Sequence, residues 1–286
     1  MRRLAVVIGA TLAITGFVTA AEAQNAHQVQ EIVFETSAGA QLAGTLTLPD
    51  GEGPHPAALI VSASGPHVRN EARHGGHHWL ELAARLADVG IATFCFDARG
   101  VGGSASETIP AWQYKWTPAE LADDSRAALM ALREQAQIDP ARIGLIAFSD
   151  GNLRAAMIAS DASQNVAFTV LLSASGVSAG ENLRAQTVGQ AKQMGKDETQ
   201  LDRIDELMTQ VIESLIKGAD REDTLEVAES LLEAMDVPAE QRRAVAENIV
   251  DNLSSRGARA YLALDPSTIL AGVACPVLSI NGGADN

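Results

Sequence analysis

The chain has 286 residues and a formal net charge of −15 at pH 7. This length can bury the core of one large domain or two small ones. A strongly acidic surface repels nucleic acid and anionic membranes, so we expect neither as a partner of the mature protein.

The first residues have the pattern of a secretory signal. Arg2 and Arg3 precede a short apolar run, and Ala21 and Ala23 then form the small-x-small arrangement of a signal-peptidase site. The run is too short for a comfortable membrane span, and the alternative is an uncleaved anchor. We expect residues 1–23 to be a cleaved signal peptide and the protein to be periplasmic or secreted.

The segment after the signal begins with a predicted hairpin over residues 31–48, where two alternating runs flank a glycine-containing turn. Apolar runs of buried-strand length and helical patterns then follow one another. The predicted strands cover residues 57–63, 91–97, 142–148, 166–174 and 275–281, and the predicted helices cover 78–90, 117–135 and 152–160. Strands that alternate with helices predict an α/β fold with a mostly parallel sheet and helices on both faces.

A long helical stretch interrupts this alternation. Apolar residues such as Leu201, Ile204 and Met208 recur at helical spacing, which predicts three or four amphipathic helices with solvated acidic faces. The predicted division is a signal peptide (1–23), the first part of the core (24–179), a helical cap insertion (180–253) and the second part of the core (254–286).

The two cysteines, Cys95 and Cys275, both lie in strand-like apolar runs. They fit two buried thiols. A disulfide is the alternative in an oxidising compartment, because a sequence does not reveal whether two cysteines are close enough to bond.

The stretch A-F-S-D-G, Ala147–Gly151, lies between a predicted strand and a predicted helix. It matches the nucleophile elbow G-x-S-x-G, in which small residues allow a strained turn to expose the serine, except that alanine replaces the first glycine. We therefore predict that Ser149 is a nucleophile at a helix N-terminus, where N–H groups and the helix dipole favour negative charge. The alternative is an ordinary N-capping serine or aspartate.

The loop after the strand at 57–63 supports this interpretation. It is small and contains glycine, so it can offer a backbone N–H to an oxyanion. We predict that the N–H groups of Ser64 and Asp150 form the oxyanion hole. The alternative is a simple tight turn.

Three blocks of the sequence resemble the α/β-hydrolase superfamily: "SASGPHVRNEARHGGHHWLELAARLADVGIATFCFDARGVGGS", "DPARIGLIAFSDG" and "ALDPSTILAGVACPVLSINGGAD". They are most similar to the secreted bacterial branch near serine aminopeptidases and small-acyl esterases. The resemblance implies an α/β-hydrolase fold that cleaves small acyl esters through an acyl-enzyme on Ser149 and needs no cofactor. It also makes Asp285 the acid that orients the catalytic base, and gives Asp97 and Arg99 a packing role.

The sequence departs from the family pattern around the elbow. Ala63 and Ala147 stand where the family has glycine, Phe148 and Asp150 where it usually has histidine and glutamate, and Asn152 where another glycine is common. One alanine in an elbow is tolerable, but the combined changes leave a non-catalytic binding protein as an alternative. An aminopeptidase or amidase on the same fold is the other one.

None of the six histidines follows Ser149, although the resemblance places the base after Asp285, on a loop near the C-terminus. We therefore expect the last strand, the base loop and the final helix to be missing from this sequence, and these 286 residues alone to have little activity. The run "HGGHH" at His74–His78 could supply a substitute base or metal ligands. It lacks the carboxylate or cysteine partners of a metal site, so we expect a solvated or substrate-lining loop and no metal.

Overall fold

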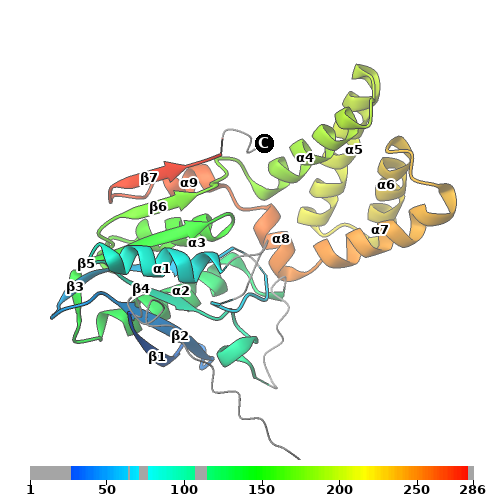
Figure 1. Ribbon diagram of the computed structural model, residues 1–286. Coiled ribbons are helices and arrows are strands. Elements are labelled where there is room, and N and C mark those ends of the chain that lie inside the picture. Colours follow the sequence, from blue (N-terminus) through cyan, green and yellow to red (C-terminus); the bar gives the residue numbers. More distant parts are fainter. Residues whose placement is uncertain (1–26, 64, 71–76, 107–114, 283–286) are drawn as a thin grey trace, which may run out of the picture.

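The computed structural model describes residues 27–63, 65–70, 77–106 and 115–282. Within them lies a seven-stranded sheet with the strand order β1-β2-β4-β3-β5-β6-β7 (Figure 1). β2 pairs antiparallel with β1 and β4, and the other neighbours are parallel, which confirms the predicted sheet and hairpin. The strands are β1 (Gln28–Glu35), β2 (Gln41–Leu48), β3 (His55–Val61), β4 (Ala92–Phe96), β5 (Ile138–Phe148), β6 (Thr169–Leu172) and β7 (Val277–Ile280).

Helices cover both faces of the sheet, as predicted. α1 (His78–Asp88) lies on one face, and α2 (Pro118–Arg133) and α3 (Gly151–Ala159) lie on the other (Figure 1). Two single 3₁₀ turns, η2 and η4, cover Gly102–Ser104 and Ala162–Gln164.

Four longer helices project from one end of the sheet and are called the helical bundle below (Figure 1). They are α4 (Ala179–Gln193), α5 (Glu198–Lys217), α6 (Arg221–Ala234) and α7 (Ala239–Leu253). Two short helices that the sequence analysis missed, α8 (Arg256–Leu262) and α9 (Pro266–Leu270), lead the chain back to β7.

Local sequence signals explain where three of the long helices begin. Each starts with a capping box, in which a side-chain oxygen accepts a bond from the third helical N–H and the third side chain returns the bond. The boxes of α2, α4 and α5 are Thr117–Glu120, Ser178–Glu181 and Asp197–Gln200. The first of them lies at the start of the helix predicted over residues 117–135.

The sheet and the bundle have separate hydrophobic cores. Central strand residues such as Leu59, Phe94 and Leu145 are fully buried against α2 and α3. A second cluster, which includes Ile204 and Leu225, lies entirely within the helices that follow β6.

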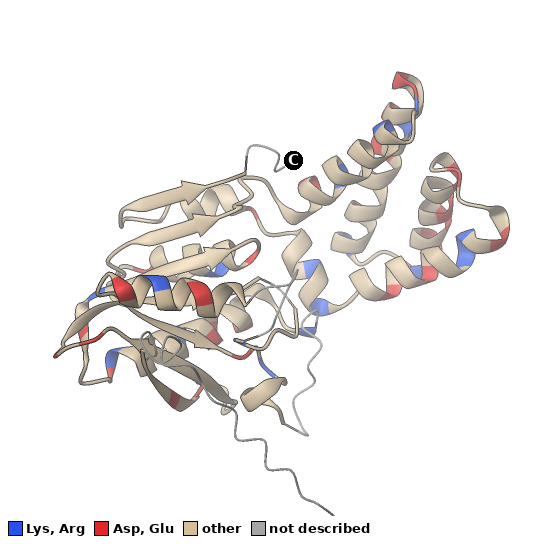
Figure 2. Ribbon diagram, viewed as in Figure 1, with Lys and Arg blue, Asp and Glu red and all other residues tan. Residues whose placement is uncertain are grey.

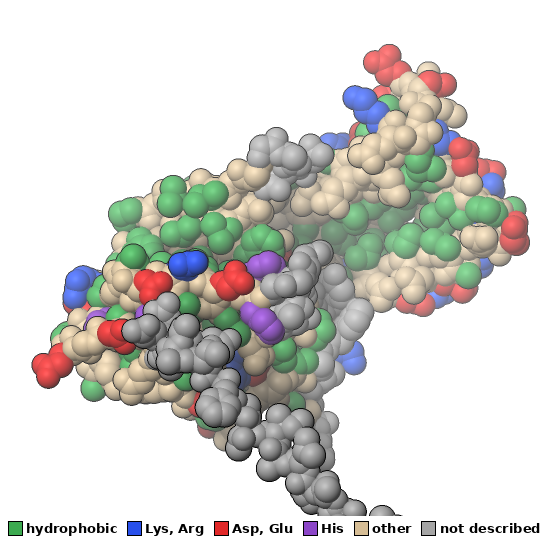
Figure 3. All heavy atoms as spheres, viewed as in Figure 1, with side chains coloured by type: hydrophobic (Ala, Val, Ile, Leu, Met, Phe, Trp, Pro, Cys, Tyr) green, Lys and Arg blue, Asp and Glu red, His purple; other side chains and the backbone are tan. Residues whose placement is uncertain are grey.

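The bundle is amphipathic. Lys, Arg, Asp and Glu are mixed along α4–α7, whereas β6 and β7 carry no charged residue (Figure 2). Hydrophobic side chains gather between α4–α5 and α6–α7 (Figure 3). The acidic residues predicted for this stretch therefore form solvated faces around an apolar interior.

The two cysteines are free thiols. Cys95 is in β4 and Cys275 precedes β7, and three strands separate them in the sheet. At about 4.8 Å per strand they lie far beyond the ~7 Å that a disulfide can span. Burial, together with the nearby Asp97 carboxylate, raises the pKa of the Cys95 thiol to about 12 although Arg69 opposes this. The alternative of a disulfide is therefore wrong.

The predicted signal peptide, residues 1–23, lies outside the described residues. Among the helices of the described part of the chain, none combines the length and the apolar character needed to cross a membrane.

Candidate active site

Ser149 occupies a strained turn between β5 and α3. Its backbone φ is +55°, a left-handed conformation that is uncommon for residues other than glycine. The turn is held by two backbone bonds: the Ser149 N–H donates to the Leu172 carbonyl at 3.0 Å, and the Ser149 carbonyl accepts from the Asn152 N–H at 3.0 Å. Because the turn points outward, the Ser149 side chain is exposed. Strain of this kind persists only where the surrounding structure enforces it, and it is common at reactive residues.

Close packing explains the small residues on either side of Ser149. A Cβ on Gly151 would lie 2.5 Å from the carbonyl oxygens of both Val61 and Ser62. Only glycine allows the start of α3 to lie against the end of β3. Ala147, two residues before Ser149, is fully buried in the core.

The N-terminal end of α3 points toward Ser149. Asp150 is the N-cap residue, but its side chain makes no capping bond to the helix. The positive end of the helix dipole therefore lies beside the serine, where it favours a developing oxyanion. This places the backbone of Asp150, one of the two predicted oxyanion donors, next to Ser149.

Asn152, which stands where the family often has glycine, joins α3 to β6. Its side chain is buried, and the amide Nδ2 donates to the Leu172 carbonyl at 2.8 Å. The same carbonyl accepts the Ser149 N–H. The departure from the family pattern at this position thus strengthens the support of the turn.

Arg154, two residues further along α3, ties the helix to the loop after β3. Its guanidinium donates to the Ser62 carbonyl, two residues before Ser64. Burial lowers the pKa of Arg154, and the charges of Asp150, Tyr261 and Asp124 partly counteract this effect. No sequence motif predicts this role of Arg154. Its one signal is that Arg154 is the only charged residue in α3.

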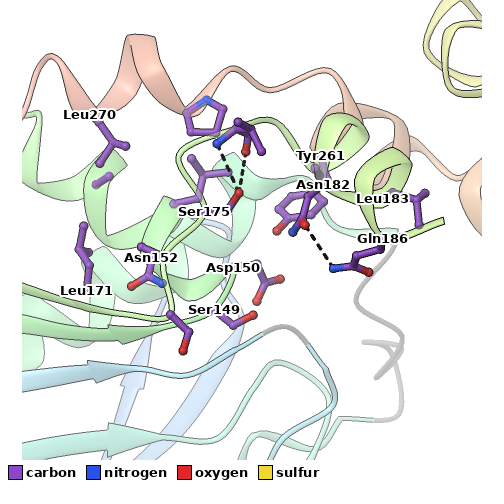
Figure 4. A pocket seen from close by; sticks show the side chains of 17 residues that line it. Ser149, Asp150, Asn152, Leu171, Ser175, Asn182, Leu183, Gln186, Tyr261 and Leu270 are labelled. Atoms are coloured by element: carbon purple, nitrogen blue, oxygen red, sulfur yellow. Dashed lines mark hydrogen bonds between the residues drawn. The ribbon is translucent and has the colours of Figure 1, made fainter. Parts of the chain in front are cut away.

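A pocket of about 190 Å³ opens at Ser149, between the sheet and the bundle (Figure 4). It is called the first pocket below. Its floor comes from α3 and the end of β6, and its roof from α4, α8 and α9. The lining residues are Ser149, Asp150, Asn152, Leu153, Ala156, Leu171, Ser173, Ala174, Ser175, Val177, Ala179, Asn182, Leu183, Gln186, Tyr261, Pro266 and Leu270.

A second pocket, of about 290 Å³, has Phe148 in its wall. It is lined by Ser62, Ala63, His67, Val68, His78, Trp79, Leu82, Phe148 and Leu172. The rings of Trp79 and Phe148 meet edge to face with centroids 6.2 Å apart. This pocket is largely apolar, with two histidines in its wall.

Only part of the run "HGGHH" is described by the structure. His74 lies outside the described residues. His77 bonds through Nδ1 to the Asn70 carbonyl at 2.8 Å, and His78 lines the second pocket. In the described ranges, no group of three or more His, Cys, Asp or Glu side chains is arranged to hold a metal ion.

Asp97 and Arg99 are buried in structural contacts. The Asp97 carboxylate accepts bonds from the N–H groups of Arg69 and Gly103, both at 2.7 Å, and pairs with the Arg69 guanidinium. Arg99 pairs with the buried Asp124 carboxylate. Neither residue lines the two pockets, which agrees with the predicted packing role.

Residues 58–286 match the model of the alpha/beta hydrolase family. The chain belongs to this family. It is 32% identical over 124 residues to an uncharacterized protein of Mycobacterium tuberculosis, a match covering 43% of this chain and 38% of that protein. The match therefore spans about two fifths of the length of this curated relative.

Two solved structures are similar to this hydrolase at the level of the fold. One is a 2,6-dihydroxy-pseudo-oxynicotine hydrolase, with a TM-score of 0.48 and 16% identity, covering 89% of this chain and 52% of that one. The other is a hypothetical protein from Pseudomonas aeruginosa, with a TM-score of 0.47 and 16% identity, covering 90% and 78%. Likenesses of this size carry no information about the substrate.

The structure places two of the four predicted site residues in this hydrolase. Ser149 and Asp150 lie together at the start of α3, at the mouth of the first pocket. Ser64 and Asp285 lie outside the described residues.

Proposed function

We propose that the protein is a serine hydrolase that cleaves carboxylic esters through an acyl-enzyme on Ser149. The observation that carries this proposal is the left-handed turn that exposes Ser149 at the N-terminus of α3 and at the mouth of a pocket. A buried or merely capping serine would need neither the strained backbone nor the close approach at Gly151.

In the proposed reaction, the Ser149 oxygen attacks the ester carbonyl carbon while its proton passes to a base. The negative oxygen is held by the N–H groups of Ser64 and Asp150, beside the positive end of α3. The tetrahedral intermediate then expels the alcohol, which takes up the proton. Water attacks the acyl-enzyme carbonyl in the same way, so the acid is released and Ser149 is restored.

The base is a separate part of the proposal. Asp285 would orient a histidine, but no histidine follows Ser149 in this sequence. Within the described residues, His67 and His78 line the second pocket beside Phe148. The changes His67→Ala and His78→Ala therefore test whether an upstream histidine supports the reactivity of Ser149.

The deciding experiment is labelling with a fluorophosphonate, which reacts with activated serines, of a chain that carries the base-bearing segment expected after Asp285. We expect a mass adduct on the peptide that contains Ser149, and no adduct in Ser149→Ala. Ser173→Ala is the matched control, because Ser173 also lines the first pocket and has a positive φ of 49°. Failure to label Ser149 in folded protein would favour the non-catalytic alternative.

A matched pair of an aryl ester and the corresponding anilide separates the ester hydrolase from the amidase alternative. Preferential turnover of the anilide would contradict the proposed substrate class.

A further inference from the structure

We propose that Asn182 and Gln186 form a polar subsite in the first pocket. This subsite selects esters that place a small, uncharged, hydrogen-bonding group there, such as a hydroxyalkyl or carboxamide group. This inference rests on the proposed function, because it assumes that the reacting ester bond lies at Ser149.

Helix α4 presents Asn182 and Gln186 to the first pocket. Asn182 and Gln186 are four residues apart, so they share one face of the helix. Both side chains line the first pocket, and Figure 4 shows them near Tyr261 and Leu183, on the side away from Leu171 and Leu270. The capping box at Ser178 fixes the start of this helix. Gly180 packs close to Ile212 of α5, because a Cβ there would lie 3.0 Å from the Ile212 side chain.

Asn182 and Gln186 can together donate and accept hydrogen bonds. Nε2 of Gln186 donates to Oδ1 of Asn182 at 3.2 Å (Figure 4). This bond orients both amides and leaves the Gln186 carbonyl oxygen as an acceptor and the Asn182 NH₂ as a donor. A hydroxyl or carboxamide can bond both groups at once, whereas an alkyl group can bond neither.

The described lining of the first pocket carries a single negative charge. Among the described residues that line the first pocket, Asp150 carries the only charged side chain. Arg154 lies near Asp150, but its guanidinium donates to the Ser62 carbonyl and does not line the pocket. A carboxylate on the substrate would therefore meet a negative group and no cation, which disfavours anionic esters.

The two pockets differ in size and in the side chains that line them. The first pocket measures about 190 Å³, somewhat larger than the ~150 Å³ cavity that accepts benzene. The second pocket is larger and has Trp79 and Phe148 in its wall. The transfer of an apolar group from water is more favourable into the second pocket than into the first. The first pocket, with its amide pair, therefore suits a small polar group better.

The test compares the binding of three methyl esters that differ at the far end of the chain: methyl 6-hydroxyhexanoate, methyl heptanoate and monomethyl adipate. Binding is measured by ligand-observed NMR in Ser149→Ala protein, where no reaction through Ser149 consumes the ester. The quantity of interest is the ratio of the dissociation constants of the hydroxylated and the alkyl ester.

Replacing both amides, Asn182→Leu with Gln186→Leu, should raise the dissociation constant of the hydroxylated ester relative to that of the alkyl ester about tenfold. The reason is that each neutral hydrogen bond contributes a severalfold preference. The matched control is Asn248→Leu with Asn252→Leu. That pair makes the same kind of amide bond, at 3.1 Å on α7, outside the first pocket. It should leave the ratio unchanged.

Monomethyl adipate should bind more weakly than the hydroxylated ester, and Asp150→Asn should reduce that difference. A ratio that stays the same in a folded Asn182→Leu, Gln186→Leu protein would overturn the inference. Because the assay needs no turnover, it gives a result even if Ser149 proves unreactive, so failure of the proposed function and failure of this inference remain distinguishable.

Discussion

The sheet and the helical bundle contribute differently to the candidate site. The sheet region places Ser149 through a left-handed turn, a glycine without room for a side chain, and two hydrogen bonds that the Leu172 carbonyl accepts, from the Ser149 N–H and the Asn152 amide. The bundle contributes side chains, chiefly Asn182 and Gln186, that line the roof of the pocket. Because each region has its own buried core, the proposed chemistry and the proposed selectivity belong to units that are packed separately.

Two side-chain replacements, one in each buried core, test this separation and have the largest expected effect. Leu145 of β5 and Ile204 of α5 are both fully buried, so replacing either with alanine should cost about 2–5 kcal/mol in its own region. Hydrogen exchange should show Leu145→Ala exposing amides of β3, β5 and β6, and Ile204→Ala exposing those of α4–α7. Only Leu145→Ala should slow the labelling of Ser149. Loss of protection throughout the molecule in both variants would show that the two cores unfold as one.

Arg154 allows a test that is confined to the sheet region, because its side chain lies there, close to Ser149. Arg154→Met removes the bond to the Ser62 carbonyl and should slow Ser149 labelling about tenfold or more, since bonds to charged groups contribute ~1.5–3 kcal/mol. Arg133→Met is the control. Arg133 also donates to a backbone carbonyl, that of Gln164, and burial also lowers its pKa, but it lies away from both pockets. Equal slowing in both variants would indicate a general loss of structure.

Two glycines provide a matched pair from the two regions. Gly151→Ala forces a Cβ against two carbonyl oxygens and should lower the free energy of unfolding by about 1–3 kcal/mol. A Cβ on Gly189, within α4, would meet no other atom within 4 Å, so Gly189→Ala should raise the free energy of unfolding by about 0.5–1 kcal/mol. Denaturant titration measures both. A destabilising Gly189→Ala would mean that α4 is packed more tightly than its contacts indicate.

The smallest expected effect concerns the contact between α8, which follows the bundle, and α2 of the sheet region. Arg256 at the start of α8 pairs with Glu120 of α2 at 2.7 Å, in a largely exposed position. Burial would raise the pKa of Glu120, but bonds from Arg256 and Thr117 outweigh it and hold the pKa below its ordinary value. Arg256→Ala should cost less than about 1 kcal/mol at pH 7.

The pH dependence of this effect follows from the direction of the shift. A carboxyl whose pKa is lowered by folding stabilises the protein above its unfolded pKa, about 4.3 for glutamate, and loses this contribution as the pH falls through the folded pKa. The difference in unfolding free energy between wild type and Arg256→Ala should therefore disappear in acid. Arg126→Ala, which breaks a pair with Asp123 within α2, is the control for ordinary surface ion pairs. A difference that grows in acid would refute this assignment.

The sequence predicts the sheet well because its signals are local. Continuous apolar runs identify the buried strands, and capping residues identify the start of α2. β6 is shorter than predicted, although Ala167 and Phe168 still bond to β5 through their backbones. The helices α8 and α9 were missed because five to seven residues cannot display a helical period. Their one usable signal was the capping residues Ser255 and Asp265.

The candidate site is only partly visible in the sequence. The motif around Ser149 predicts the turn, because small residues are required next to it. The roof of the pocket does not follow from any motif, since Asn182 and Gln186 reach it only when α4 packs against α8 and faces α3 across the pocket. Arg154 was missed for the same reason: its partner, the Ser62 carbonyl, is 92 residues away in the chain.

The order of the strands also has a consequence for folding kinetics. β7 pairs with β6 although the two are separated by roughly a hundred residues, and closing a flexible loop of that length is entropically costly and slow. The bundle lies entirely within this loop and has a core of its own. If α4–α7 collapse early, they shorten the loop before it closes. The insertion would then act as a folding aid that brings the last strand to the sheet.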